Sequence, residues 1–239
     1  MVDTTTDTPA RSATPVEGLL LVDKPAGMTS HDVVQRVRRI YGERSIGHLG
    51  TLDPFATGLL VLLIGRSTRL ATFIHTEPKI YEASMRFGTE TDTDDETGAV
   101  IRTAAAPPEQ SVRSAVEKLA GEISQVPPAY SAKSVDGTRA YDAARRGEPL
   151  DLPAATVFIH SWDLHSYRDG LLTATVTCSG GTYIRALARD LGRLTDSAAH
   201  LASLRRTRVG EFDVAKAPTL ERLEANPTRI TALRVVADA

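Results

Sequence analysis

The feature that most constrains this sequence is an unbroken apolar run of six residues, Leu59–Ile64, which follows a glycine-rich loop. The run is far too short to cross a bilayer, so it is typical of a segment buried inside a soluble globular protein. One acidic residue, Asp53, lies in the loop just before the run. A carboxylate at the edge of a buried segment costs free energy unless its charge is paired or used. The rest of the chain must therefore supply a partner or a task for Asp53.

The composition permits a large core and leaves the class of partner open. The chain has 239 residues, 41% of them hydrophobic, which is enough for one large domain or two small ones. Its net charge of -2 neither indicates nor excludes a nucleic-acid partner, because a polyanion responds to local basic patches as well. The single cysteine, Cys178, excludes an internal disulfide and a cysteine-pair metal site. No apolar leader precedes the folded part, so we predict a cytoplasmic protein without a membrane contact.

The N-terminal part predicts a tail, a strand and a capped helix. Residues 1–16 are rich in Thr, Asp, Ala and Pro and are predicted to be disordered. A short buried strand follows at Leu19–Val22, and Lys24–Gly27 turns out of it. Thr29 or Ser30 can cap a helix that ends at Gly42, because the apolar residues between them recur at helical spacing.

The outer face of this helix is basic. It carries Arg36, Arg38 and Arg39, and Arg44 follows shortly after. A solvated face is one interpretation and a face that contacts phosphates is the other. On this pattern alone the solvated face is favoured.

Further along, strand and helix patterns alternate without a regular βαβ rhythm. Residues 81–87 place Tyr81 and every second residue after it on one face of a half-buried strand. Asp169–Gly170 is a strong hairpin signal between two strands. Helices are predicted in four stretches: residues 111–122, 137–147, 182–194 and 197–206. The pattern favours the α+β class with a sheet that is at least partly antiparallel.

Common cofactor and metal signatures are absent from the sequence. It contains no P-loop, no dinucleotide fingerprint, no nucleophile elbow and no zinc-protease motif. The acidic stretch "ETDTDDETG" resembles a calcium loop but lacks the required glycine and the final glutamate, so it is interpreted as a solvated loop. The histidines are scattered. We therefore predict no metal site.

Five motifs remain, and together they carry a family resemblance. They are "GHLGTLDP", Tyr81 after "EPKI", "QVPPAYSAKSVDGTRAYDAARRGEPL", "SGGTYIRALARDLG" and "HLASLRRTRVG". In this order, from about Gly18 to Gly210, the chain resembles the TruB-type tRNA pseudouridine synthases, which convert uridine 55 in the TΨC loop of tRNA into pseudouridine. The resemblance implies an isomerase. It also implies a pseudouridine synthase fold, with a mixed, largely antiparallel central sheet flanked by helices.

The resemblance also implies a domain organisation and the absence of a cofactor. Residues 17–239 would form the catalytic domain, with an RNA-binding insertion at about residues 125–152 that closes over the RNA. No complete C-terminal PUA-like domain is expected after it. The reaction breaks the C1′–N1 bond of uridine, turns the uracil and rejoins it through C5. Because no electrons are exchanged, no cofactor is expected.

The resemblance assigns the chemistry to Asp53 as the nucleophile, acting on either C1′ or C6 of the uridine. A lone buried carboxylate would have its pKa raised and would lose its charge, so a cation must lie against it. The family motif indicates Arg185 as that partner, since a guanidinium can bind a carboxylate through two parallel hydrogen bonds. The alternative interpretations are that Asp53 is a turn or cap residue before Pro54 and that Arg185 lies on a helix surface.

The resemblance gives other residues supporting roles. Tyr81 would stack on the target base and help to remove the C5 proton, although it could also be an ordinary core tyrosine. Tyr183 and Leu204 would line the uracil pocket, and His48 would hold the nucleotide outside its stack. Lys24 and Lys79 match further substrate-binding positions of the family.

The expected partner is the TΨC stem-loop of tRNA, with no obligate protein partner and a monomeric chain. Arginines in two clusters are predicted to contact the RNA backbone: Arg139, Arg145 and Arg146 in the insertion, and Arg205, Arg206 and Arg208 near the end of the resemblance. Two alternatives remain open at this point. One is a relative of the RNA-guided pseudouridine synthases, and the other is a tRNA-binding folding helper with dispensable catalysis.

Overall fold

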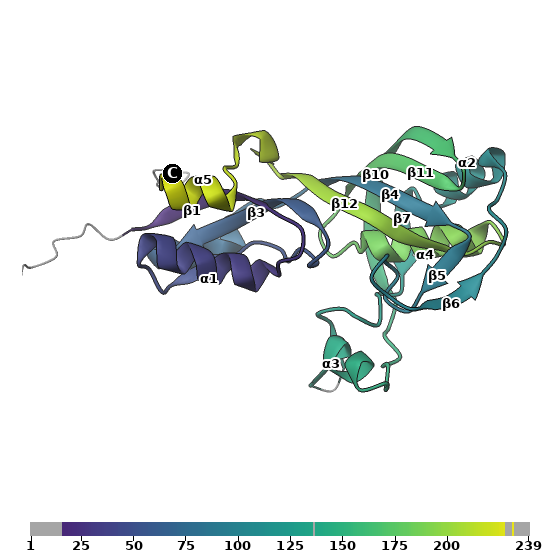
Figure 1. Cartoon of the computed structure of the whole chain (residues 1–239), viewed down its shortest axis with the longest axis horizontal. Helices are drawn as coiled ribbons and strands as arrows, with labels where there is room; N and C mark the ends of the chain where they lie inside the picture. Colours follow the sequence, from purple (N-terminus) through teal and green to yellow (C-terminus); the bar gives the residue numbers. More distant parts are fainter. Residues whose placement is uncertain (1–15, 136, 228–230, 232–239) are drawn as a thin grey trace, which may run out of the picture.

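The computed structural model describes residues 16–135, 137–227 and 231, and its main feature is one nine-stranded sheet (Figure 1). The strand order is β1-β3-β12-β4-β11-β10-β7, with β2 paired to β3 and β13 paired to β12. Pairing is antiparallel throughout this sheet except between β3 and β12. The strands are β1 Gly18–Lys24, β2 Ile46–His48, β3 Thr57–Ile64, β4 Lys79–Phe87, β7 Gly121–Gln125, β10 Ala155–Arg168, β11 Leu171–Cys178, β12 Ala199–Val209 and β13 Phe212–Asp213. The predicted α+β class and mixed, largely antiparallel sheet are confirmed.

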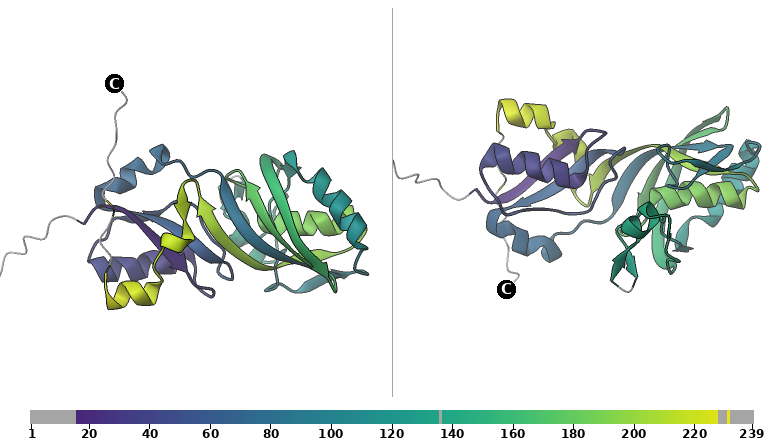
Figure 2. Two further views of the ribbon diagram at one scale, coloured as in Figure 1. Left: turned by 90° about the horizontal axis from the view of Figure 1, so that it is seen from above. Right: turned by 60° about the horizontal axis from the view of Figure 1, so that its bottom comes forward.

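The apolar run lies in β3, which is covered on both faces. Each of its residues is at most 1% exposed. Leu60, Leu62 and Ile64 pack with α1 (Ser30–Tyr41) and α5 (Leu220–Ala225). Leu59, Val61 and Leu63 pack in a separate cluster on the other face, with Leu19, Leu49 and Val209. The 3-10 helix η1 (Gly65–Phe73) lies on the opposite side of the sheet from α1, as the left view of Figure 2 shows. The run is therefore uniformly apolar because neither of its faces meets water.

Helix α1 begins and ends where the sequence indicates. Thr29 is the N-cap, and it forms a capping box with Asp32, whose side chain accepts a hydrogen bond from the Thr29 backbone. Gly42 ends the helix in the left-handed conformation, with φ of 66°. The capped helix predicted from the sequence is confirmed.

The second half of the sheet packs on α4 (Ile184–Leu194) and α2 (Glu109–Lys118). Tyr81, Ala83, Met85 and Phe87 of β4 face this core, as their alternation predicts. Strands β10 and β11 form the predicted hairpin. Asp169 and Gly170 both have positive φ, 50° and 70°, as the mirror-image hairpin turn requires.

One predicted helix is wrong, because residues 199–209 form strand β12. Leu201 and Leu204 are three residues apart, which is a helical spacing, yet both are buried against the same core. The register explains this: Leu201 lies opposite Met85, and Leu204 lies opposite Ala83 two positions earlier in β4. The strand therefore contains a bulge between them, and the extra residue imitates a helical pattern.

A separate segment connects β7 to β10 and projects away from the sheet (Figure 1). It contains β8 (Ser134–Val135), β9 (Thr138–Arg139) and α3 (Ala140–Arg145). These three elements fall within the predicted insertion of about residues 125–152, whose role remains a prediction. A smaller ribbon joins β5 (Thr89–Thr91) to β6 (Val100–Thr103).

The predicted disordered tail, residues 1–16, lies outside the described residues except for Val16. Within the described ranges, we find no helix with the length and apolar character needed to span a membrane.

Candidate active site

Asp53 lies in the loop between β2 and β3, and this loop is fixed to the start of α1. The Ser30 hydroxyl accepts a hydrogen bond from Leu52 N at 2.9 Å and donates one to Leu52 O at 3.2 Å. Gly27 N donates to Pro54 O at 2.8 Å. The backbone on each side of Asp53 is therefore bound to the turn that follows β1 and to the first residue of α1.

Two buried cations brace the same loop through backbone carbonyls. The Lys24 ammonium donates to Pro25 O, Met28 O and Pro54 O at 2.9, 2.7 and 3.2 Å. Burial lowers the pKa of Lys24 to about 8, with a further lowering contribution from Arg206 and an opposing one from Asp53. The resemblance implies that Lys24 binds substrate, but its side chain is fully buried and its contacts are structural.

Arg206 is the second of these cations, and its predicted contact with the RNA backbone is wrong. The residue is 1% exposed. Its guanidinium donates to Leu59 O, Gly50 O and Thr51 O at 2.8, 3.0 and 3.3 Å. A side chain enclosed in this way cannot reach a phosphate in solvent, so Arg206 supports the Asp53 loop instead.

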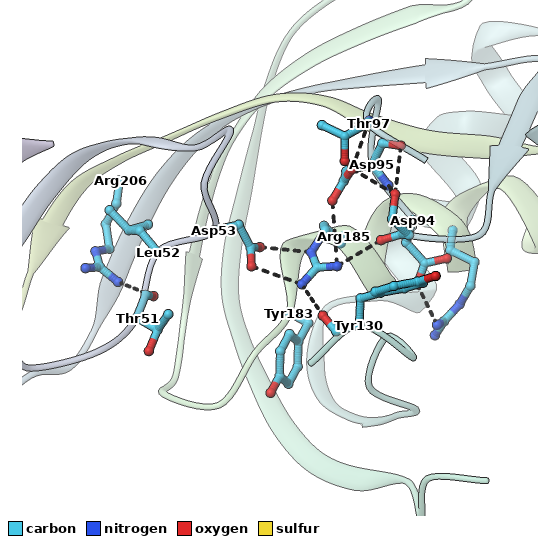
Figure 3. A network of polar contacts seen from close by, with 12 residues as sticks. Thr51, Leu52, Asp53, Asp94, Asp95, Thr97, Tyr130, Tyr183, Arg185 and Arg206 are labelled. Carbon is cyan, nitrogen blue, oxygen red and sulfur yellow. Dashed lines mark hydrogen bonds and ion pairs between the residues drawn. The ribbon is translucent and has the colours of Figure 1, made fainter. Parts of the chain in front are cut away.

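The structure brings Asp53 and Arg185 into a two-pronged ion pair (Figure 3). Arg185 Nε donates to Asp53 Oδ2 at 2.9 Å, and Nη2 donates to Oδ1 at 3.1 Å. The Arg185 side chain is only 4% exposed, whereas that of Asp53 is 32% exposed. The pair therefore presents a carboxylate to solvent while a buried guanidinium fixes its orientation.

Arg185 is itself held from three further directions. Its Nη1 donates to Thr93 O at 2.9 Å and lies 3.7 Å from a carboxylate oxygen of Asp95. Its Nη2 also donates to Tyr130 O at 2.9 Å. Helix α4, the loop after β5 and the segment after β7 therefore meet at this one side chain, as Figure 3 shows.

The acidic stretch interpreted as a solvated loop is in fact buried at Asp94 and Asp95, which are 6% and 4% exposed. Asp95 Oδ1 accepts hydrogen bonds from Thr93 Oγ1 and from the backbone and hydroxyl of Thr97. Asp94 pairs with Arg189 at 2.9 Å. Burial nevertheless raises the pKa of Asp94 to about 6, because desolvation outweighs the attraction of Arg189.

The spacing of the arginines in α4 is a sequence pattern that indicates this network of ion pairs. Arg185, Arg189 and Arg193 recur every fourth residue along α4 and so lie on one face of the helix. They meet the carboxylates of Asp53, Asp94 and Glu90 in turn. A row of arginines on a helix therefore indicated a matching set of acids elsewhere in the chain.

The two predicted tyrosines lie near the ion pair. Tyr81 is 7% exposed on β4, and burial raises its pKa. Tyr183 precedes α4, and its backbone N and O pair with the Gln125 side chain at 2.8 and 3.2 Å. Burial also raises the pKa of Tyr183, and its ring lies beside the Asp53–Arg185 pair in Figure 3. Leu204 lies opposite Ala83 on the core face of β12.

His48 and Lys79 flank the glycine-rich loop. His48 ends β2, and its buried Nδ1 has no hydrogen-bond partner among the described residues. Burial and the charge of Arg206 lower its pKa. The Lys79 side chain approaches Gly50, which has φ of 90°, and burial lowers the pKa of the lysine as well.

The arginines predicted in the insertion lie in and beside α3, whereas Arg205 lies on β12. Arg205 forms two hydrogen bonds with Asp23, at 3.0 and 2.8 Å. Arg139, Arg145 and Arg146 are exposed in and beside α3, where Arg145 lies over the ring of Tyr141 at 5.6 Å. The cluster in the insertion is therefore open to solvent, and Arg205 is engaged within the chain.

A groove of about 500 Å³ lies beside Leu204, but Asp53, Tyr81 and Tyr183 are not among the residues that line it. Its polar lining comes from the outer face of the sheet and includes Glu82, Ser84 and Thr173. Within the described residues, no group of three or more metal-ligating side chains occurs.

Comparison with known sequences identifies the family. Residues 38–184 match the N-terminal domain of the TruB family pseudouridylate synthases, and residues 185–234 match the C-terminal domain of tRNA pseudouridylate synthase B. The chain belongs to the TruB family. The Asp53–Arg185 pair joins these two ranges, since the second one begins at Arg185.

Relatives within the TruB family are similar over most of their length. The chain is 51% identical to tRNA pseudouridine synthase B of Arthrobacter sp. (strain FB24), over 87% of this chain and 71% of that protein. It is 47% identical to tRNA pseudouridine synthase B of Thermobifida fusca (strain YX), over 93% of this chain and 80% of that protein.

Solved structures share the fold of this TruB family member. A Cbf5-Nop10-Gar1 complex contains a chain that is similar with a TM-score of 0.68 and 25% identity, over 93% of this chain and 61% of that one. An H/ACA RNP bound to a substrate RNA containing 2'-deoxyuridine gives a TM-score of 0.66 and 26% identity, over 87% and 52%. The chain thus spans between half and two thirds of the length of these structural relatives. The predicted pseudouridine synthase fold is confirmed.

Proposed function

We propose that this chain converts uridine 55 in the TΨC loop of tRNA into pseudouridine, with Asp53 as the nucleophile. The observation that carries the proposal is the ion pair of Asp53 with Arg185, because it holds one carboxylate in a fixed orientation while a third of that side chain stays open to solvent. Support for the substrate comes from the relatives, which are named tRNA pseudouridine synthase B.

The reaction conserves atoms and electrons. The C1′–N1 bond breaks with its electron pair on the uracil, the ring turns, and C5 forms the new bond to C1′. The proton on C5 is lost and N1 gains one, so substrate and product are isomers. Asp53 would form a transient covalent bond with either C1′ or C6, which stabilises the intermediate until C5 is in position. No cofactor is required for these steps.

We infer that the groups around Asp53 receive an extruded pyrimidine. We assign Tyr81 to stacking on the base and to loss of the C5 proton, and Tyr183 and Leu204 to the walls of the uracil site. An aromatic ring stacked on an unpaired base contributes about 1–3 kcal/mol. We assign His48 to holding the displaced nucleotide, since removing a base from its stack costs a few kcal/mol. The Lys79 side chain, at the start of β4, approaches Gly50 of the glycine-rich loop and would bind the RNA nearby.

We further propose that the segment at residues 125–152 grips the stem-loop through Arg139, Arg145 and Arg146, whose exposed charges would set the salt dependence of binding. We also propose a monomer that works in the cytoplasm without an obligate protein partner. The Asp53–Arg185 pair lies within one chain, so the proposed chemistry needs no residue from a second copy.

The test is release of tritium from tRNA labelled at uridine C5. The purified chain alone should release tritium from an unmodified TΨC stem-loop, and Asp53→Asn should not. Asp163→Asn is the matched control, because Asp163 is a carboxylate with a side chain that is 77% exposed on β10. Release by Asp53→Asn at the rate of the unchanged chain would refute the assignment of the nucleophile.

The same assay separates the two alternative functions. The chain is structurally similar to chains of an H/ACA RNP and of a Cbf5-Nop10-Gar1 complex, so the assay should also test for an RNA-guided enzyme. Release that requires an added guide RNA would favour it. Tight binding of tRNA without any release would favour a folding helper.

A further inference from the structure

The basic residues at the end of α1 line a groove that the proposed site does not use. This α1 groove, of about 610 Å³, is formed by Gln35, Arg38, Arg39, Gly42, Glu43 and Arg44. It contains three arginines and one glutamate, and Arg39 and Arg44 are exposed. The carboxylate of Glu43 accepts a hydrogen bond from Ser45 N at 2.7 Å. The glutamate of the groove is therefore engaged with its own turn.

Nine other described arginines form ion pairs with carboxylates, but these three do not. None of them has a described carboxylate within 4.0 Å. The neighbouring Arg36, in contrast, lies 2.8 Å from a carboxylate oxygen of Glu224. Arg38 and Arg39 lie in the last turn of α1, where a cation also stabilises the helix dipole, but Arg44 lies beyond the helix. The dipole thus does not account for the whole group.

The groove lies at a defined distance from Asp53. The first residue of α1, Ser30, is bonded to Leu52, the residue before Asp53. The helix has 12 residues, and at 1.5 Å per residue the groove is about 18 Å along the axis from that contact. With the lower side of the molecule turned forward, α1, α4 and the segment with α3 all lie in front of the sheet (Figure 2, right). At roughly 3 Å per base pair, 18 Å corresponds to about five or six base pairs of a duplex.

We propose that the α1 groove binds the phosphate backbone of an RNA helix about five or six base pairs away from the target uridine. The inference rests on the proposed function, which places that uridine at Asp53. Arg39 and Arg44 are exposed and have no described carboxylate partner, which suits phosphates, because a guanidinium can bind a phosphate through two hydrogen bonds. The partner is double-stranded RNA, and the contact carries no base specificity because it reaches only the backbone.

The experiment compares two substrates that differ in reach. One is full-length unmodified tRNA, and the other is its TΨC stem-loop trimmed to about three base pairs, which would extend only about 10 Å from the loop. The variant is Arg39→Ala with Arg44→Ala. Arg38 is kept, because its Nη2 donates to Ile46 O in β2. The matched control is Lys118→Ala with Arg168→Ala, which removes two exposed charges at the other end of the sheet.

With full-length tRNA, the groove variant should raise KM about three- to tenfold and leave kcat unchanged, and the slope of log KM against log salt should fall by about one to two. With the trimmed stem-loop it should behave as the unchanged chain does, and its thermal unfolding should match that of the control. An equal loss on both substrates, or no difference from the control on full-length tRNA, would overturn the proposal. Tritium release by the unchanged chain from the trimmed stem-loop tests the proposed function separately.

Discussion

The two halves of the sheet contribute opposite kinds of polar group to the boundary between them. The half built from β1, β2 and β3 supplies acceptors: the carboxylates of Asp53 and Asp23 and the carbonyls of Gly50, Thr51 and Leu59. The half built from β4, β12 and α4 supplies donors, which are the guanidinium groups of Arg185, Arg205 and Arg206. Each arginine reaches across to the other half.

This difference shows how Asp53 is kept both oriented and available. The half that contains Asp53 also contains a buried cation, Lys24. The ammonium of Lys24 donates all three of its described hydrogen bonds to backbone carbonyls and none to Asp53. Arg185, which binds Asp53 through two hydrogen bonds, comes from the opposite half. The buried carboxylates of that half, Asp94 and Asp95, lie against arginines of α4. Asp53 is therefore paired across the boundary and still partly exposed. We expect the three arginines of the boundary to differ in how much each contributes to stability and catalysis.

Removing Arg206 should have the largest effect on stability. Arg206→Leu would leave three carbonyls without their donor, and we expect a loss of roughly 3–5 kcal/mol in the free energy of unfolding. Urea denaturation followed by circular dichroism measures this loss. A loss below about 1 kcal/mol would show that water replaces the guanidinium and that the boundary does not depend on it.

Changing Arg185 should act on catalysis. Arg185→Lys keeps the positive charge but loses the fork that holds Asp53, so we expect kcat for tritium release to fall roughly 10²- to 10³-fold. Arg193→Lys on the same helix is the control, because Arg193 pairs with Glu90 and its side chain is 57% exposed. If both variants lost the same activity, orientation of Asp53 by the fork would not be the reason.

Asp94, which belongs to the half with α4, should make the free energy of unfolding depend on pH. Its pKa is about 6 in the folded chain against an ordinary value of 3.8, so the folded state binds more protons than the unfolded state between these two values. Stability from this group therefore falls as the pH rises through that window, by up to about 3 kcal/mol. Asp94→Asn should lack this pH dependence. Urea denaturation of the unchanged chain and of the variant should therefore give a difference in unfolding free energy that changes between the two pKa values. A difference that stays constant with pH would contradict the prediction.

Arg205 should matter least of the three boundary arginines. Its side chain is 38% exposed, so its pair with Asp23 is screened by solvent and Arg205→Leu should cost about 1 kcal/mol or less. The comparison with Arg206→Leu, one residue further along β12, keeps the strand and the substitution the same. If the two variants lost the same free energy of unfolding, burial would not explain how much each arginine stabilises the boundary.

The sequence predicted those parts of the fold that depend on local chemistry. The cap at Thr29, the end of α1 at Gly42 and the turn at Asp169–Gly170 each follow from a few neighbouring residues. The pairing of Asp53 with Arg185 came from a family resemblance, since the two residues are far apart in the chain. Their catalytic roles remain predictions.

The wrong predictions share a physical cause, which is that the deciding partner lies elsewhere in the chain. Strand β12 looked helical because a bulge put an additional residue between Leu201 and Leu204. The acidic stretch looked solvated because its partner, Arg189, lies on α4. Arg206 looked like a phosphate contact because the carbonyls that enclose it belong to β3 and the loop before it.

The short parallel contact between β3 and β12 has a mechanical consequence. The register there covers only Arg205 opposite Thr57 and Arg206 opposite Gly58. A Cβ atom on Gly58 would meet the backbone of Arg206, so only glycine permits this approach. Few backbone hydrogen bonds therefore join β3 to β12. The two strands are held together mainly by side chains, which include the guanidinium of Arg206 and the packing of Val209 against Leu59 and Val61.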